Sequence, residues 1–349
     1  MKIGLVIYGS LDTLSGGYLY DRKLVDYLRA QGDMVEVISL PWRNYAAHLT
    51  DNLTFRLPPN LDILIQDELN HPSLLAANLG PHPYPVVSLV HHLRCSELRP
   101  NWQNAFYRLV ERQYLRSVDG FIFNSQTTAG VVSRLVPPKP SVVAYPPTDR
   151  FGARVTEEEV IERAVAPELR ILFLGNVMFR KGLHTLIDAV RGLKSKVQVD
   201  VIGSLTTEPG YAQAMRDKAA VHGLSSTVHF HGPLDNAPLT EKLKAAHALV
   251  VPSSYEGFGI VYLEGMGFGL PAIGTTAGAA GEVIREGETG YLIPPGDSVT
   301  LAERLSALAS QRGLLVRLSH NALRRFRAQP TWDQAAHAIR NFLLERVEA

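Results

Sequence analysis

The segment YEGFGIVYLEGMGFGLP (255–271) combines features that do not fit an ordinary buried helix. Five glycines and two glutamates, Glu256 and Glu264, interrupt an otherwise apolar stretch. Buried carboxylates are costly unless they are paired, and a glycine inside a helix costs about 1 kcal/mol relative to alanine. A hydroxyl-rich ligand would satisfy the carboxylates, and its close approach to bare backbone would explain the glycines. The segment therefore predicts a binding site.

The local pattern places the two glutamates at different points of a strand–turn–helix unit. A strand should end near Val251, and a helix should begin near Gly259 or Ile260. Glu256 then lies just ahead of a helix N-terminus, where a carboxylate is favoured, and Glu264 lies about one turn inside. The alternative is a capping Glu256 and a solvent-facing Glu264. That alternative leaves a set of glycines unexplained: Gly257, Gly259, Gly265, Gly267 and Gly269.

Short apolar runs recur on both sides of this segment and alternate with helical patterns. Most are continuously apolar, as expected for parallel strands that are covered on both faces. Runs of this kind in the first half are 3–8, 34–40, 62–66, 86–90, 120–124 and 141–145. Those in the second half are 169–176, 197–204, 227–232, 247–254 and 271–275. The alternation predicts an α/β protein with doubly wound sheets.

The two sets of strands indicate two α/β halves of similar size. A polar, glutamate-rich interval at 154–168 separates them, and we interpret it as the connection between domains. Ligands of such sheets bind beyond the carboxyl ends of the strands. Two facing sheets would therefore form one cleft between them.

Composition narrows the class of protein. The chain has 349 residues, 46% of them hydrophobic, and a formal net charge of +1, which argues against a nucleic-acid partner. The single cysteine, Cys95, excludes an internal disulfide and is typical of a reducing compartment. No apolar run approaches the roughly 18 residues of a membrane span, and the apolar start is too short for a signal peptide. We therefore expect a cytoplasmic protein.

Two glycine-containing turns are candidate phosphate sites. Gly16 and Gly17 follow the first strand and precede its helix, although an ordinary turn would look the same. In GNVMFRKG (175–182), Arg180 and Lys181 stand just before another helix. Cations at a helix N-terminus oppose the helix dipole, and a bound anion would resolve that conflict. The alternative is a solvated loop.

The histidines in HHLRC (91–95) also follow a predicted strand. A nucleophile or a metal site with Cys95 is one alternative, but no third ligand or orienting acid is visible nearby. We prefer a histidine that binds substrate. The chain contains no Asp-x-Asp, so a carboxylate-held metal on a diphosphate is not indicated.

A basic and aromatic helical stretch covers 101–119. Its arginines fall four residues apart, and aromatic residues lie close by: Arg108, Arg112, Arg116, Trp102, Phe106, Tyr107 and Tyr114. Such a helix could touch anionic lipid. We prefer a solvated face, with Glu111 and Asp119 as acidic neighbours.

Taken together, these residues resemble the large family of retaining GT-B glycosyltransferases that use nucleotide sugars, the glycosyl transferases group 1. The most specific part is PSSYEGFGIVYLEGMGFGLP (252–271), which is similar to the family's Glu-(x)7-Glu donor motif. The resemblance implies two Rossmann-like domains facing across a cleft. The first would be an acceptor-side domain, 1–152 with a C-terminal crossover helix at 331–349, and the second a donor domain, 166–330.

The resemblance also implies residue roles. Glu264 would hold the ribose hydroxyls, and Glu256 would face the transferred sugar. The implied catalytic residues are His91, Lys181 and Glu256. The implied donor-binding residues are Gly16, Gly17, Asn176, Arg180, Lys181, Glu256, Gly257, Phe258, Gly259, Ile260 and Glu264. No metal ligand and no cofactor are expected.

Two positions depart from the family pattern. Asn176 stands where the family usually has an arginine, and Arg180 is the candidate to supply the missing charge. His92 stands where the family often has an acid.

The expected activity is transfer of a sugar from a UDP-, GDP- or ADP-sugar to a hydroxyl of a sugar, lipid-linked or small-molecule acceptor. The resemblance implies a retaining hexosyltransferase, and the residues imply transfer without a metal. Alternatives are a sugar-nucleotide epimerase or a phosphorylase on this architecture, and a nucleotide-binding module without catalysis. Weak peripheral membrane contact stays open, and no nucleic-acid partner is expected.

Overall fold

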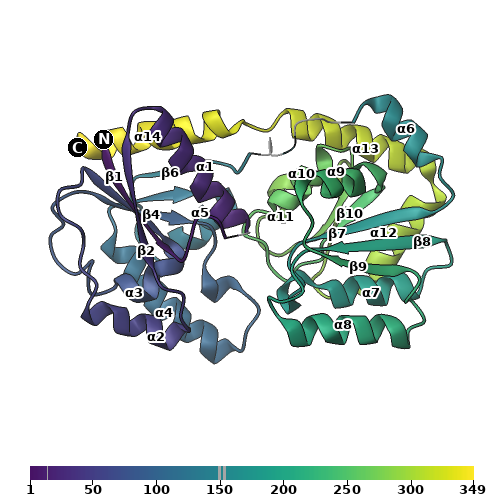
Figure 1. The fold of residues 1–349 in the computed structure, drawn as a ribbon, viewed down its shortest axis with the longest axis horizontal. Coiled ribbons are helices and arrows are strands. Elements are labelled where there is room, and N and C mark those ends of the chain that lie inside the picture. Colours follow the sequence, from purple (N-terminus) through teal and green to yellow (C-terminus); the bar gives the residue numbers. More distant parts are fainter. Residues whose placement is uncertain (14, 148–150, 152–154) are drawn as a thin grey trace. The chain divides into compact units, whose positions relative to one another are not determined.

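The computed structural model describes residues 1–13, 15–147, 151 and 155–349. The chain forms two compact units, Met1–Pro147 with Pro330–Ala349, and Thr148–Gln329. Each unit is built around one six-stranded sheet with helices on its faces (Figure 1). Among the described residues, no helix is long and apolar enough to cross a membrane.

The sheet of the first unit is entirely parallel and has the order β2-β1-β3-β4-β5-β6. Its strands are β1 (Lys2–Tyr8), β2 (Met34–Leu40), β3 (Ile63–Asp67), β4 (Val86–Val90), β5 (Gly120–Phe123) and β6 (Ser141–Val143). Its helices are α1 (Gly16–Ala30), α2 (Tyr45–Thr50), α3 (His71–Leu74), α4 (Asn101–Ser117), α5 (Gln126–Ser133) and α14 (Trp332–Val347). Short 3₁₀ turns are η1 (Asp51–Leu53), η2 (Glu68–Asn70) and η3 (Arg94–Ser96).

Two apolar clusters cover the two faces of this sheet. Successive side chains of a strand point to opposite faces, so Leu5 and Val6 of β1 enter different clusters. Leu5 packs in the cluster that contains Leu24 of α1 and Ile339 of α14. Val6 belongs to the cluster that contains Leu115 of α4. The first sheet is therefore buried on both faces, which is why its strands are continuously apolar.

The second sheet is also parallel, with the order β12-β11-β10-β7-β8-β9. Its strands are β7 (Leu169–Leu174), β8 (Val197–Ile202), β9 (Val228–Gly232), β10 (Ala248–Val250), β11 (Ala272–Thr275) and β12 (Gly290–Ile293). Its helices are α6 (Glu157–Ala164), α7 (Leu183–Arg191), α8 (Pro209–Val221), α9 (Asn236–Ala245), α10 (Ile260–Met266), α11 (Ala280–Val283), α12 (Ser298–Ser310) and α13 (Arg312–Arg327). A 3₁₀ turn, η4 (Phe179–Lys181), precedes α7.

The interpretation of 154–168 as a connection was wrong for its central part. Residues 157–164 form α6, which belongs to the second unit and has a capping box between Thr156 and Glu159. Val160 is buried, and Arg163 donates hydrogen bonds to three backbone carbonyls of the unit. Glutamates in a first turn favour a helix because they complement its dipole. Residue 154 and the predicted boundary at 152 lie outside the described residues.

Candidate active site

Two loops at the carboxyl edge of the second sheet lie directly against each other. Strands β7 and β10 are parallel neighbours, and their ends lead into the segments 175–182 and 251–259. Gly182, with a φ of 72°, ends η4, and a Cβ there would lie 2.0 Å from the carbonyl oxygen of Pro252. The amide of Ser254 donates to the carbonyl of Arg180 over 2.8 Å. Glycine at 182 is therefore required by the contact between the loops.

This contact brings Lys181 and Glu256 together. Lys181 Nζ donates to Glu256 Oε1 over 2.5 Å, and Ser253 Oγ donates to the same oxygen over 2.6 Å. The lysine side chain is 14% exposed and the glutamate side chain 8%. Arg180 NH1 lies 4.0 Å from the glutamate oxygen and donates to the carbonyl of Tyr255 over 2.7 Å. Two cations therefore surround one buried carboxylate.

The charges of this cluster depend on one another. Burial opposes ionisation of Glu256, but Lys181 and Arg180 outweigh it and lower the pKa of the carboxyl to about 2. Burial lowers the pKa of the Lys181 ammonium, Glu256 raises it, and Arg180 lowers it further, with a net lowering. Glu256 is thus ionised at neutral pH and has partners inside the protein. The expectation that Glu256 needs a ligand to be satisfied was wrong, because the sequence did not show that Lys181 and Ser253 reach it.

Glu264 lies inside α10 and is only 4% exposed. The helix begins at Ile260 after Gly259, whose φ is 91°, as the sequence predicted. No side chain caps it, so the alternative of a capping Glu256 and a solvent-facing Glu264 is wrong. Glu264 is therefore a buried residue of α10, and its role at the ribose of a donor stays a prediction.

Three glycines of this segment serve packing, contrary to the expectation that they expose backbone to a ligand. A Cβ at Gly265, Gly267 or Gly269 would lie 3.0 Å from Leu249, 3.0 Å from Phe326 and 2.7 Å from Val160, respectively. Gly269 also has a φ of 66°, which disfavours other residues. These glycines let α10 and the turn after it approach β10, α13 and α6.

The family pattern predicts an arginine at position 176, where this chain has an asparagine. Asn176 Oδ1 accepts a hydrogen bond of 3.3 Å from the amide of Ser204, just beyond β8. Lys181 instead lies across the loop, with its Cε 3.6 Å from where a Cβ of Gly175 would stand. The side-chain cations of this loop are therefore Arg180 and Lys181.

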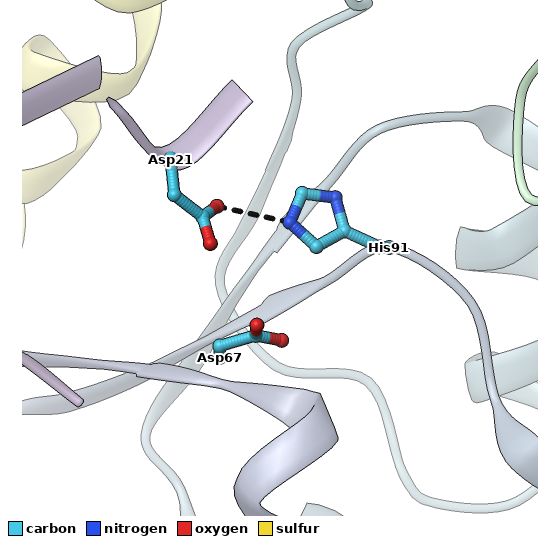
Figure 2. Close-up of side chains that lie close together, drawn as sticks. All are labelled: Asp21, Asp67 and His91. Atoms are coloured by element: carbon cyan, nitrogen blue, oxygen red, sulfur yellow. Dashed lines mark hydrogen bonds and ion pairs between the residues drawn. The ribbon is translucent and has the colours of Figure 1, made fainter. Parts of the chain in front are cut away.

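In the first unit, His91 and two acids form a second buried cluster (Figure 2). His91 follows β4, Asp67 ends β3, and Asp21 comes from the inner face of α1. His91 Nε2 and Asp21 Oδ1 are 2.9 Å apart, and Asp21 is fully buried. A Cβ at Gly17 would lie 3.4 Å from the imidazole ring, so the predicted phosphate turn and His91 are neighbours.

The acids set the charge of His91. Burial alone would lower its pKa, but Asp21, Asp67 and Glu68 raise it to about 9. Burial, together with repulsion from Asp21, raises the pKa of Asp67 to about 7, although His91 opposes this shift. At neutral pH the histidine is therefore an imidazolium held by Asp21, with Asp67 near its own titration point.

The sequence analysis missed Asp21, Asp67 and Glu68. A usable signal existed for each of them. Asp67 and Glu68 directly follow the run 62–66, and Asp21 falls on the buried face of α1 with Leu24 and Leu28. An acid at an apolar helix position or beyond a buried strand is a candidate for a functional pair.

Two groups among the described residues have the spacing of metal ligands: Asp21, Asp67 and His91, and Glu68, His71 and Glu111. Both groups are paired only in part. In the first group, His91 pairs with Asp21 Oδ1, whereas Asp21 Oδ2 and, in the second group, Glu68 Oε1 are buried without a hydrogen-bond partner in the part of the chain that the structure describes. In the second group, Glu111 accepts from the backbone amides of Arg94 and Cys95.

The nucleophile considered at Cys95 is not supported. Burial, followed by Glu111, raises the pKa of the Cys95 thiol to about 12, so it is not a thiolate at neutral pH. The Nε2 atom of His92 lies 3.0 Å from the carboxylate of Glu97, five residues further along the chain.

The chain is similar to several known glycosyltransferases. The family model for glycosyl transferases group 1 matches residues 156–325. The D-rhamnosyltransferase WbpZ of Pseudomonas aeruginosa is 30% identical over 264 residues, which cover 70% of this chain and 67% of that protein. The phosphatidyl-myo-inositol mannosyltransferase of Mycobacterium leprae is 26% identical over 352 residues, 88% of this chain and 87% of that protein. A D-inositol 3-phosphate glycosyltransferase of Xylanimonas cellulosilytica is 31% identical over 172 residues, but only 40% of its length is covered.

A solved structure shows the same fold. Anabaena HepE in complex with UDP-glucose aligns with a TM-score of 0.75 at 19% identity, over 99% of this chain and all of that one. The predicted α/β fold of the GT-B class is therefore confirmed.

Proposed function

Because the chain belongs to the family of group 1 glycosyltransferases, we propose that it transfers a sugar from a nucleoside-diphosphate sugar to an acceptor hydroxyl. The observation that carries this proposal is the buried Lys181–Glu256 pair, with Arg180 beside it, at the carboxyl edge of the second sheet. Ligands of open α/β sheets bind at this edge. The cluster offers cations to a diphosphate and a carboxylate to sugar hydroxyls.

Binding of the donor would replace the ion pair between Lys181 and Glu256 with one between Lys181 and the diphosphate. A diphosphate that reaches Lys181 competes with Glu256 for the ammonium, and Glu256 is then free to accept hydrogen bonds from the sugar. Glu264 would accept hydrogen bonds from the ribose hydroxyls. Hydrogen bonds to charged groups contribute about 1.5–3 kcal/mol each.

The same cations would assist the chemical step. Transfer breaks the bond between the anomeric carbon and the diphosphate oxygen, and negative charge develops on the leaving diphosphate. Once the diphosphate has replaced Glu256 as the partner of Lys181, Lys181 and Arg180, which is held by the Tyr255 carbonyl, would stabilise that charge as it develops. This role makes a metal ion unnecessary, and we propose transfer without metal and with retention at the anomeric carbon.

Residues of the first unit complete the proposal. Asp21 fixes Nε2 of the His91 imidazolium, which leaves the other ring nitrogen, Nδ1, to donate a hydrogen bond to the transferred sugar. The Gly16 and Gly17 amides, at the start of α1, would bind the diphosphate. The acceptor would be a sugar, a lipid-linked sugar or a small molecule.

The relatives set the order in which donors are tested. HepE was solved with UDP-glucose, so UDP-sugars come first, followed by GDP- and ADP-sugars. Each donor is incubated with and without an acceptor panel, and the products are followed by NMR. We expect release of nucleoside diphosphate from one donor class, stimulated by an acceptor, and unchanged by excess EDTA. Loss of activity with EDTA that magnesium or manganese restores would contradict the metal-independent site.

The same assay separates the alternatives. Conversion of the donor to an epimeric sugar nucleotide without an acceptor would identify an epimerase and contradict transfer. Binding without turnover of any donor would identify a binding module. As a matched control, Lys218→Ala removes another lysine of the second unit, which pairs with Asp188, and should leave turnover unchanged.

A further inference from the structure

Helix α4 (Asn101–Ser117) carries an apolar stripe on its outer face. Its inner face is buried through Glu111, Tyr114 and Leu115. Trp102, Phe106 and Leu109 follow one another at intervals of four and three residues and therefore share the opposite face. Their exposed fractions are 72%, 44% and 69%. Large side chains in such a row on the outside of a helix are unusual for a purely solvated surface.

Arginines run beside this stripe, and no acid does. Arg112 and Arg116 lie next to it on the helix surface and are exposed, and Arg108 follows further round. The only acid within α4 is Glu111, which is fully buried and accepts hydrogen bonds from the Arg94 and Cys95 amides.

The preferred interpretation of this helix as a solvated face relied on two acidic neighbours. Glu111 points inward, as its burial shows. Asp119 lies beyond the end of α4 and accepts a hydrogen bond from the amide of Val86. The outer face of α4 therefore combines an apolar stripe with exposed arginines and carries no acid of its own helix. The solvated-face interpretation explains neither the stripe nor the missing acids.

We propose that α4 docks the protein on an anionic lipid surface. The aromatic and leucine side chains would enter the boundary between headgroups and acyl chains, and the arginines would pair with lipid phosphates. The positive charge beside the stripe favours this partner over a second copy of the chain, because two copies of the face would repel each other. The inference does not depend on the proposed sugar transfer.

Helix α2 borders this face, since the rings of Tyr45 and Phe106 lie 6.0 Å apart, and Phe106 stays 44% exposed. Figure 1 shows α2, α3 and α4 on one side of the first sheet, with α1 and α14 on the other. Helix α4 contacts α3 and η3. Leu98, in the loop before α4, is also exposed, at 67%.

The test is co-sedimentation of the full chain with vesicles of phosphatidylcholine alone or with added phosphatidylglycerol. We expect binding only with the anionic lipid, weakened by high salt because exposed charges are screened. Each arginine near an anionic surface contributes about fivefold to partitioning. Arg112→Glu with Arg116→Glu should therefore lower partitioning by more than about 25-fold. The triple variant Trp102→Ser, Phe106→Ser and Leu109→Ser should abolish it.

Matched controls replace exposed residues of the second unit. Val221→Ser and Val299→Ser remove side chains that are 83% and 69% exposed, and Arg191→Glu reverses an exposed charge. These variants should bind vesicles like the wild type, and all variants should keep the wild-type Tm. The proposal is overturned if the wild type does not bind anionic vesicles or if the α4 variants bind them as well as the wild type does. A concentration-dependent dimer that the triple variant loses, without vesicles present, would also overturn it.

Discussion

Lys181 is buried against Glu256, and its proposed role is to stabilise charge that develops on the leaving diphosphate. Only interactions that strengthen in the transition state raise the rate of chemistry. Lys181→Ala should therefore lower kcat more than it weakens donor binding, by roughly 10²–10³. Arg180→Ala should show a smaller defect of the same kind, which Asn176→Arg in that background should partly recover. Wild-type turnover in Arg180→Ala would end the idea that Arg180 replaces the family arginine. Steady-state kinetics and donor titration measure both quantities.

The charge of His91 gives a pH prediction. Its pKa is raised to about 9, above the usual value of 6.5, so the imidazolium contributes stability below about 6.5 and loses it as pH rises through about 9. If that imidazolium takes part in transfer, kcat/KM should fall as pH rises through about 9. Asp21→Asn removes the main charge that raises this pKa. In this variant, kcat/KM should therefore begin to fall at a pH closer to neutral.

NMR titration of the His91 ring in the same variant reports the pKa directly. The control is Asp26→Asn, an exposed acid of the same helix, which should leave the profile unchanged. A wild-type profile in Asp21→Asn would show that the pair does not set the charge of His91.

At the scale of elements, α10 depends on glycines for its approach to its neighbours. Gly269→Ala adds a Cβ 2.7 Å from Val160 at a φ of 66°. The left-handed conformation costs about 1–2 kcal/mol for a residue with a Cβ, and overpacking adds about 1–3 kcal/mol. Gly313→Ala, where a Cβ meets nothing within 4 Å, should be neutral or slightly stabilising. Urea unfolding measures both, and equal stability of the two variants would contradict the packing role.

The elements differed in how well the sequence predicted them. β1 and β4 were predicted well because buried parallel strands are continuously apolar, whatever their partners. β12 was missed because Gly290–Ile293 is a short run between turns, and only its pairing with β11 makes it a strand. The segment of α6 was interpreted as a linker because it is highly charged and has only two buried positions, Val160 and Ala164.

The pattern of strands also predicts where the candidate site lies, but not which of its residues pair. Lys181 and Glu256 each follow a strand, so their edge of the sheet could be predicted from the alternation of strands and helices. Their pairing could not, because it depends on β7 and β10 being neighbours in the sheet order. The Asp21–His91 pair joins residues that are 70 positions apart, which no local pattern encodes.

At the scale of the whole molecule, the last helix completes the core of the first unit. Ile339 of α14 is 1% exposed and packs in the cluster that contains Leu5 and Leu24. Ile339→Ala should destabilise this unit by about 2–5 kcal/mol through lost burial and a residual cavity. Hydrogen exchange should show faster opening of the first unit, whereas the exposed Glu345→Ala should behave like the wild type. Faster exchange confined to the second unit would contradict this assignment.

The central claim is that the second unit binds a nucleoside-diphosphate sugar through Glu264 and the Lys181–Glu256 loops. Isothermal titration calorimetry of wild type, Glu264→Ala and the exposed control Glu303→Ala tests it most directly. The account predicts that one donor class binds the wild type and Glu303→Ala alike. Glu264→Ala should bind it about 10- to 100-fold more weakly, since one charged acceptor of about 1.5–3 kcal/mol is lost. Unchanged affinity in a folded Glu264→Ala protein would contradict the account.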